Sequence, residues 1–179
     1  RFNEPSMQYF QDPSAAKTAI RQLWGEAVML WGDAAPVKFK ETNDAWDFEL
    51  AMQPADRCSI NGCTLARAFF PDAGRHDLAI YPKMFTQSRK EQIDTFIHEI
   101  GHVFGLRHFF ADVSETQWAS VIFGTHKPFS IMNYGSQSEL TADDKSDLKL
   151  LYSKVWSGAL TEINGTRIVK VRPYHDLLH

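Results

Sequence analysis

Residues 98–108 read H-E-I-G-H-V-F-G-L-R-H, which is the pattern H-E-x-x-H-x-x-G-x-x-H. On a helix, His98 and His102 lie four residues apart and therefore project from one face. Glycine adopts the left-handed conformation that ends a helix in a sharp turn, so Gly105 would let His108 come back toward the same point. The spacing therefore predicts three imidazoles around one metal ion.

Three imidazoles and one carboxylate suit a catalytic zinc site. Zinc accepts imidazole nitrogen readily, and a catalytic zinc keeps three protein ligands and a water molecule. We predict one catalytic zinc ion held by His98, His102 and His108. Glu99, beside the first ligand, is predicted to take a proton from the zinc-bound water. The alternative is a packed helix that carries histidines by chance.

The extended motif resembles the signature of the metzincin metalloproteases. Residues 130–134, Ser-Ile-Met-Asn-Tyr, resemble the Met-turn of that family, which implies that Met132 forms a hydrophobic floor beneath the metal. Tyr134 stands where matrixins usually have proline and astacin-like and serralysin-like enzymes have tyrosine. The resemblance implies that its phenol stabilises the oxyanion of the transition state. The alternatives are an ordinary core methionine and a packed aromatic ring.

The order of the expected elements indicates one α+β domain. Apolar periodicity predicts a helix over residues 15–31. A capping signal at Ser88 and Glu91 predicts the start of the zinc helix, and a similar signal at Thr141 and Asp144 predicts a last helix that ends at about residue 154. Strands are expected at 37–40, 46–50, 64–70 and 78–81. This order resembles a matrixin-like catalytic domain over residues 1–155, with the metzincin (zincin-like) fold. The fold implied is a mixed twisted sheet with a helix packed on it, an upper subdomain (about 1–105), a lower subdomain (about 106–155) and an extension (about 156–179).

The resemblance also implies how a substrate is bound. Residues 64–71 look like the upper-rim strand of matrixins, along which the substrate lies as an added antiparallel strand. The alternative is an ordinary edge strand protected by Arg67. The predicted substrate-binding residues are Leu65, Ala66 and Arg67 on the rim, and Thr95, Asn133, Gly135 and Ser136 around the pocket beside the zinc.

Several segments depart from the matrixin pattern. The region 72–81 has one histidine, and Arg67 stands where matrixins often have another, so we expect no structural zinc. No loop offers the oxygen cluster that calcium needs, so calcium is not expected either. We interpret His76 and Asp77 as turn residues. Residues 109–129 form an unusually long connection, and Ile168–Val171 is interpreted as an extra strand.

The two cysteines, Cys58 and Cys63, enclose an Asn-Gly turn signal. They are predicted to form a disulfide, which would imply an oxidising compartment. The alternative is two free thiols in a turn. The chain opens at Arg1 without a visible signal peptide, which fits a trimmed secreted enzyme and a cytosolic protein alike. With the expected disulfide, we predict a secreted enzyme whose signal peptide and any propeptide are not in this chain.

Composition narrows the class of protein. The chain has 179 residues, 44% of them hydrophobic, and a formal net charge of −3. No binding to nucleic acid or membrane is expected, and we expect a monomer acting on protein or peptide substrates. The predicted function is zinc-dependent endopeptidase. The alternatives are a catalytically silent zinc-holding module, against which Glu99 argues, and an amidase acting on a small or cell-wall substrate.

Overall fold

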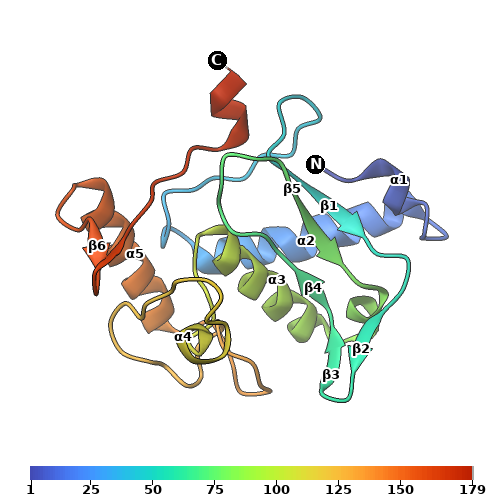
Figure 1. Cartoon of the computed structure of the whole chain (residues 1–179). Helices are drawn as coiled ribbons and strands as arrows, with labels where there is room; N and C mark the ends of the chain where they lie inside the picture. Colours follow the sequence, from blue (N-terminus) through green and yellow to red (C-terminus); the bar gives the residue numbers. More distant parts are fainter. Residues whose placement is uncertain (179) are drawn as a thin grey trace.

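The computed structural model describes residues 1–178. A three-stranded sheet, in the order β1-β5-β4, forms one layer of an α+β structure. Strand β1 (Phe48–Met52) pairs in parallel with β5 (His76–Ile80), which pairs antiparallel with β4 (Ala66–Arg67). Helices α2 (Pro13–Trp31) and α3 (Arg89–Val103) form the second layer (Figure 1). Strand β4 therefore lies at an edge, and no strand within residues 1–178 pairs with its outer side.

The two long helices pack against each other. Helix α2 (Pro13–Trp31) begins at Asp12, whose carboxylate accepts a hydrogen bond from the Ala15 amide. Helix α3 (Arg89–Val103) begins at Ser88, whose hydroxyl accepts from the Glu91 amide, as the capping signal predicts. Their buried faces join strands β1 and β5 in one core, whose largest fully buried members include Trp31, Phe96, Ile20, Leu78, Ile80, Ile97 and Ile100.

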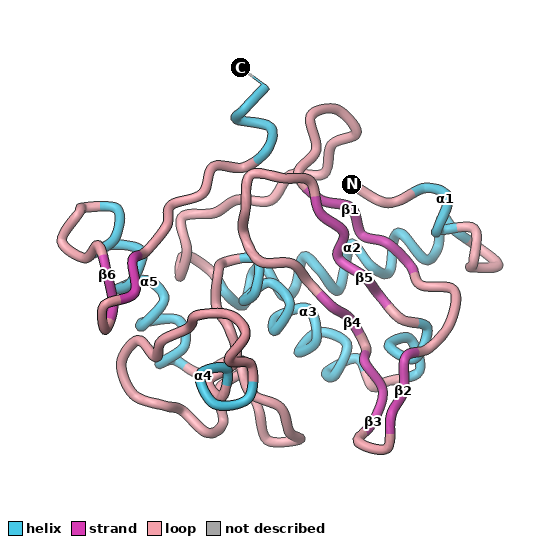
Figure 2. The backbone as a smooth tube through the Cα atoms, in the orientation of Figure 1, coloured by secondary structure: helices cyan, strands magenta, loops and turns pink. Residues whose placement is uncertain are grey.

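Shorter elements complete the chain, and loops connect most of them (Figure 2). The last long helix has the predicted capping box, because Thr141 and Asp144 bond reciprocally at its start. No helix within residues 1–178 combines the length and the apolar character that crossing a membrane requires. The remaining elements are α1 (Glu4–Met7), β2 (Arg57–Ser59), β3 (Gly62–Thr64), η1 (Pro82–Thr86), α4 (Ala111–Ser114), α5 (Ala142–Trp156), β6 (Glu162–Ile163), β7 (Thr166–Arg167) and η2 (Tyr174–Leu178).

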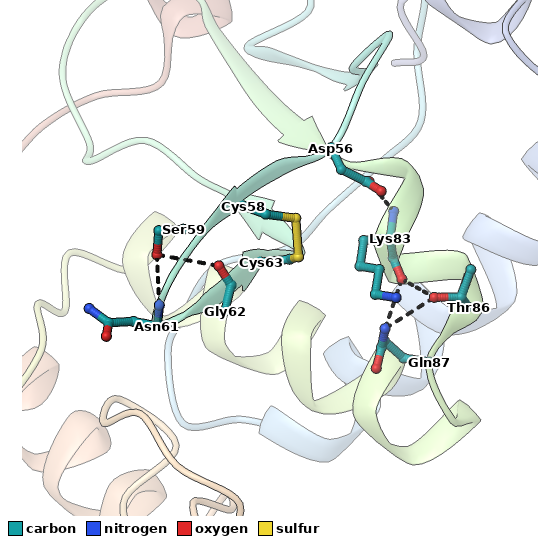
Figure 3. The surroundings of a disulfide bond; sticks show 9 residues. All are labelled: Asp56, Cys58, Ser59, Asn61, Gly62, Cys63, Lys83, Thr86 and Gln87. Carbon is teal, nitrogen blue, oxygen red and sulfur yellow. Dashed lines mark hydrogen bonds between the residues drawn. A yellow bond between two sulfur atoms is a disulfide. The ribbon is translucent and has the colours of Figure 1, made fainter.

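The predicted disulfide is confirmed. Cys58 and Cys63 are directly opposite each other in the antiparallel hairpin β2–β3, and their sulfur atoms are bonded (Figure 3). The two-residue tip holds Ile60 fully exposed. The bridge therefore closes a short hairpin at the end of the sheet that leads into the rim strand.

The strand expected at residues 37–40 is absent, and that prediction is wrong. Phe39 instead packs its ring edge-to-face on Trp24 within an irregular segment. The outer side of β1 is occupied by the N-terminal residues, because the Leu50 amide donates to the Arg1 carbonyl and the Asn3 amide to the Leu50 carbonyl. That side of β1 therefore has no free backbone groups for residues 37–40 at this position.

The strand expected over 64–70 is broken into two short strands. Thr64 ends β3, Leu65 lies between the strands, and β4 holds only Ala66 and Arg67. Pairing stops because the Ala68 amide donates to the Glu99 carboxylate instead of to a strand. His76 and Asp77, interpreted as turn residues, are in fact the first residues of β5, because parallel pairing with β1 begins there.

The extra strand expected at Ile168–Val171 is also wrong in position. The tail contains a small hairpin, β6–β7, with Asn164 and Gly165 at its turn. Both turn residues have positive φ, at 50° and 79°, which is the conformation that Asn-Gly hairpins favour. The tail then runs back to the upper part of the molecule, where His175 bonds to Asp47 near the N-terminus (Figure 1).

Candidate active site

The three histidines of the motif converge. The Nε2 atom of His98 lies 3.1 Å from Nε2 of His102 and 3.1 Å from Nε2 of His108. Helix α3 supplies the first two rings, and the chain then turns at Gly105, whose φ is 95°. This left-handed turn brings His108 back to the other two rings, by the route that the spacing predicts.

Backbone carbonyls orient the two helix histidines. His98 donates through Nδ1 to the Ile131 carbonyl at 2.6 Å, and His102 through Nδ1 to the Leu106 carbonyl at 2.8 Å. Burial is the main cause that lowers the pKa of His98 to about 3 and that of His102 to about 4. Both rings are therefore neutral, with the Nε2 lone pair free to bind a metal.

A carboxylate orients the third histidine. His108 donates through Nδ1 to Glu115 Oε1 at 2.7 Å, and the other oxygen of Glu115 accepts from Arg107 Nη2 at 2.8 Å. Burial alone would raise the pKa of Glu115, but the hydrogen bonds from His108 and Arg107 outweigh it and lower the pKa. Glu115 is thus an ionised carboxylate directly behind the third ring.

The donor set fits zinc. The three ligand nitrogens lie within 4.8 Å of one another. Ligands at the usual Zn–N distance of about 2.0–2.1 Å in a tetrahedron are separated by roughly 3.3 Å, close to the 3.1 Å observed for two pairs. A hydrogen bond from the other ring nitrogen, which all three imidazoles make, is the usual environment of a metal-binding histidine. His98, His102 and His108 would therefore hold the ion.

Glu99 is buried between α3 and the rim of the sheet. Its Oε2 accepts a hydrogen bond of 2.6 Å from the Ala68 amide, at the point where β4 ends. Burial raises the pKa of Glu99 to about 7, against the opposing effects of the Ala68 amide and the Arg67 charge. A carboxyl group with a pKa near neutrality can both accept and return a proton at physiological pH.

Met132 packs against Gly101 of α3, the helix that carries His98 and His102. It is 2% exposed, and a Cβ atom built on Gly101 would overlap its sulfur and lie 3.2 Å from its Cε. Gly101 is thus the residue of the zinc helix that allows the turn to approach. The close approach explains why position 101, directly before His102, carries no side chain.

A buried hydroxyl holds this turn. Ser130 is fully buried, donates from Oγ to Asp144 Oδ1 at 2.5 Å, and accepts from the Met132 amide at 3.0 Å. Asp144 also completes the capping box of α5 through its other oxygen. The start of α5 and the floor of the site are therefore one hydrogen-bonded unit.

Tyr134 lies beside the ligands. Its ring centroid is 4.6 Å from that of His108 and 5.7 Å from that of His98. Although 70% of the residue is exposed, desolvation of the phenol, with smaller effects from Glu99 and Glu115, raises its pKa to about 12. The phenol is therefore protonated and able to donate a hydrogen bond at the open side of the site.

The residues expected to bind substrate fall into two groups. Ala66 and Arg67 lie on the edge strand with Leu65 just before them, and Gly135 and Ser136 are exposed after the Met-turn. Two others make bonds elsewhere. Asn133 donates from its side-chain amide to the Lys127 carbonyl, and the Thr95 hydroxyl bonds within its own helix. None of the four predicted pocket residues, Thr95, Asn133, Gly135 and Ser136, lines the cavity of about 720 Å³ behind His108, between α5, residues 118–123 and the tail.

Sequence reasoning missed two contributors to the site. Glu115 comes from the long connection after His108, and the Ala68 amide comes from the end of the rim strand. Neither has a periodic signal, since a carboxylate in an irregular segment and a backbone amide are defined only by the folded path. The length of the connection was the only available hint that residues 109–129 have a role of their own.

Comparisons with known proteins identify the family. The sequence model of the Matrixin family matches residues 6–153. Macrophage metalloelastase of Rattus norvegicus is 23% identical over 154 residues, which cover 80% of this chain and 31% of that protein. Stromelysin-3 of Xenopus laevis is 27% identical over 149 residues, which cover 76% of this chain and 28% of that protein. No solved structure gives a significant match. The chain spans about 30% of the length of these relatives.

The match covers most of the chain and includes α2, the sheet, the histidine motif and the Met-turn. The α+β architecture and the convergent histidines agree with the metzincin fold of that family. The resemblance predicted from the histidine motif is therefore confirmed at the level of the family. The chain belongs to the matrixin family of metalloproteases.

Proposed function

We propose that this chain is the catalytic domain of a zinc-dependent endopeptidase. The observation that carries the proposal is the convergence of His98, His102 and His108 on one point, beside the buried carboxyl of Glu99. A zinc ion held by the three Nε2 atoms would act as a Lewis acid and lower the pKa of a water molecule. The remaining chemistry is supplied by side chains of this chain.

Glu99 is the proposed general base and acid. With a pKa near 7, its carboxylate takes the proton as water attacks the scissile carbonyl and returns it to the leaving amine. The Ala68 amide holds the carboxylate at the end of β4. The proposed base is therefore attached to the same strand along which the substrate would bind. The phenol of Tyr134, protonated at all physiological pH values, donates to the developing oxyanion.

The substrate binds as an extended strand along β4. Only one side of β4 is paired within the described residues, so the backbone groups of its outer side are available to a peptide. Main-chain hydrogen bonds supply affinity in this mode, and alternate side chains supply specificity. Gly135 and Ser136 are exposed after Met132 and border the substrate side chain next to the cleaved bond.

We also propose that residues 1–179 act as one secreted, monomeric domain with an upper and a lower subdomain. The disulfide between Cys58 and Cys63 supports an oxidising compartment. The cluster of His98, His102 and His108 supports a single catalytic zinc, and we expect neither structural zinc nor calcium. Elemental analysis of the purified protein tests that stoichiometry.

The test is cleavage of casein by the wild-type chain, by Glu99→Gln and by Glu91→Gln. Glu91 is an exposed glutamate in the first turn of the same helix and serves as the matched control. Removing the base is expected to lower kcat/KM by about 10²–10⁴-fold with zinc retained, because general base catalysis contributes that much. The control should cleave like the wild type, and a zinc chelator should abolish cleavage.

Each contrary result has a defined meaning. Full activity of Glu99→Gln would refute the role of Glu99 as base. Tight zinc binding without cleavage of casein but with hydrolysis of short amides would indicate an amidase. Zinc binding without either activity would indicate a silent binding module.

A further inference from the structure

The third metal ligand differs from the other two in how it is held. His98 and His102 lie on helix α3 and donate to backbone carbonyls. His108 lies in an irregular segment after Gly105 and donates to the side chain of Glu115. A helix fixes the backbone of its residues, whereas a ring on an irregular segment needs a side-chain partner to restrict its rotation.

Glu115 is itself fixed on its other side. Arg107 Nη2 donates to Glu115 Oε2 at 2.8 Å, and Arg107 Nη1 donates to the Trp118 carbonyl at 2.7 Å. The side chains of His108 and Arg107 are 10% and 14% exposed, and that of Glu115 is 29% exposed, so water has limited access to these bonds. The guanidinium therefore holds the carboxylate in the position where it meets the imidazole.

We propose that Glu115 is the positioning residue of the third zinc ligand, and that the connection of residues 109–129 serves to bring this carboxylate behind His108. This inference depends on the zinc site of the proposed function. The carboxylate holds the ring as the tautomer with a proton on Nδ1, so Nε2 faces the metal. Its negative charge also favours a cation bound at the opposite nitrogen of the ring.

Zinc affinity measured by competition with a chromophoric chelator tests the proposal. Glu115→Gln keeps the size of the side chain and removes the charge, and it is expected to weaken zinc binding by about 10–100-fold, the range for such partners of ligating histidines. Asp112→Asn is the matched control, because Asp112 is an exposed carboxylate of the same connection. The control should stay within about twofold of the wild type. An equally small change in Glu115→Gln would overturn the proposal.

A second comparison separates positioning from simple attachment of the loop. Arg107→Ala removes the guanidinium that ties Glu115 and Trp118 but leaves the carboxylate that His108 contacts. Positioning predicts that Glu115→Gln weakens zinc binding more than Arg107→Ala does, and that it shifts the visible absorption bands of the cobalt-substituted protein by more. If Arg107→Ala weakens binding as much or more, with the cobalt spectrum of Glu115→Gln unchanged, the carboxylate only attaches the loop and the proposal fails.

These measurements do not require catalysis. A wild-type chain that binds zinc tightly and cleaves casein, together with a Glu115→Gln variant of unchanged zinc affinity, would overturn this inference alone. A wild-type chain that binds no zinc would overturn both this inference and the proposed function.

Discussion

The molecule before Gly105 and the molecule after it are held together in different ways. The first region contains α2, α3 and the sheet, and its stability comes from a continuous apolar core around residues such as Trp31 and Phe96. The second region, up to α5, is mostly irregular and contains one helix of four residues, α4. Ile131 and Met132 join the same core, whereas the segments around them are tied by individual polar contacts, such as those of Arg107 and Ser130.

The site is divided along the same boundary. The first region supplies two ligands and the carboxyl of Glu99, which are placed by a rigid helix. The second region supplies His108, the Met-turn and Tyr134, which are placed by a glutamate and by a serine–aspartate pair. The difference shows that one candidate metal site can combine two histidines placed by a helix with a third whose ring is hydrogen-bonded to a side chain.

The largest expected effect is the loss of stability when a tryptophan is removed from the first region rather than from the second. Trp31 is 1% exposed and donates to the Ile97 carbonyl at 2.9 Å, whereas Trp118 is 66% exposed. Trp31→Ala should lower the free energy of unfolding by about 3–5 kcal/mol, because it opens a cavity in the core. Trp118→Ala should change it by about 0.5 kcal/mol or less. Urea denaturation measures both, and equal losses would break the contrast between the regions.

The pH dependence of stability tests the burial of Glu99 in the first region. The pKa is about 7 in the folded chain and 4.5 for an ordinary glutamate, so its contribution to stability is complete below about pH 4.5 and is lost as the pH rises through 7. In metal-free protein, Glu99→Gln should therefore gain stability relative to wild type across this range, on the order of 3 kcal/mol. A constant difference between pH 4 and 8 would show that burial does not hold the carboxyl protonated.

Gly101 tests the contact between the regions. Ala is a better helix former than Gly by about 1 kcal/mol, but a Cβ at Gly101 would overlap the sulfur of Met132, and overpacking costs about 1–3 kcal/mol. Gly101→Ala should therefore lower the stability by about 1 kcal/mol. The control is Gly25→Ala in α2, where a Cβ meets nothing within 4 Å and a gain of about 0.5–1 kcal/mol is expected. Thermal unfolding measures both variants. A higher melting temperature than wild type for both of them would contradict the close approach of Met132 to Gly101.

A modest loss of stability, with no effect on zinc affinity, is expected at the disulfide. The bond between Cys58 and Cys63 spans five positions, so its loss frees little unfolded-state entropy. Replacing both cysteines by serine should cost about 2 kcal/mol or less. Zinc affinity should be unchanged, since the hairpin contributes no ligand. Loss of zinc binding in this variant would mean that the hairpin supports the site more directly than its position suggests.

The helices were the most predictable part of the fold, and the sheet the least. The start of α3 at Ser88 and the capping box of Thr141 depend on residues three positions apart, and these local signals are visible in the sequence. The missing strand at 37–40 depends on which segment reaches the outer side of β1 first, and the N-terminal residues occupy that side. Alternation of apolar and polar residues cannot decide between segments that are distant in sequence.

The sequence by itself determined the candidate metal site, because His98, His102 and His108 and the proposed base Glu99 are related by helical spacing and one glycine turn. Only the tertiary structure decided what surrounds them. The Ala68 amide at Glu99, the carboxylate of Glu115 behind His108, and the contact between Gly101 and Met132 join segments that no local period connects. Contacts of this kind depend on the path of the backbone through space, which the packing of the whole core determines.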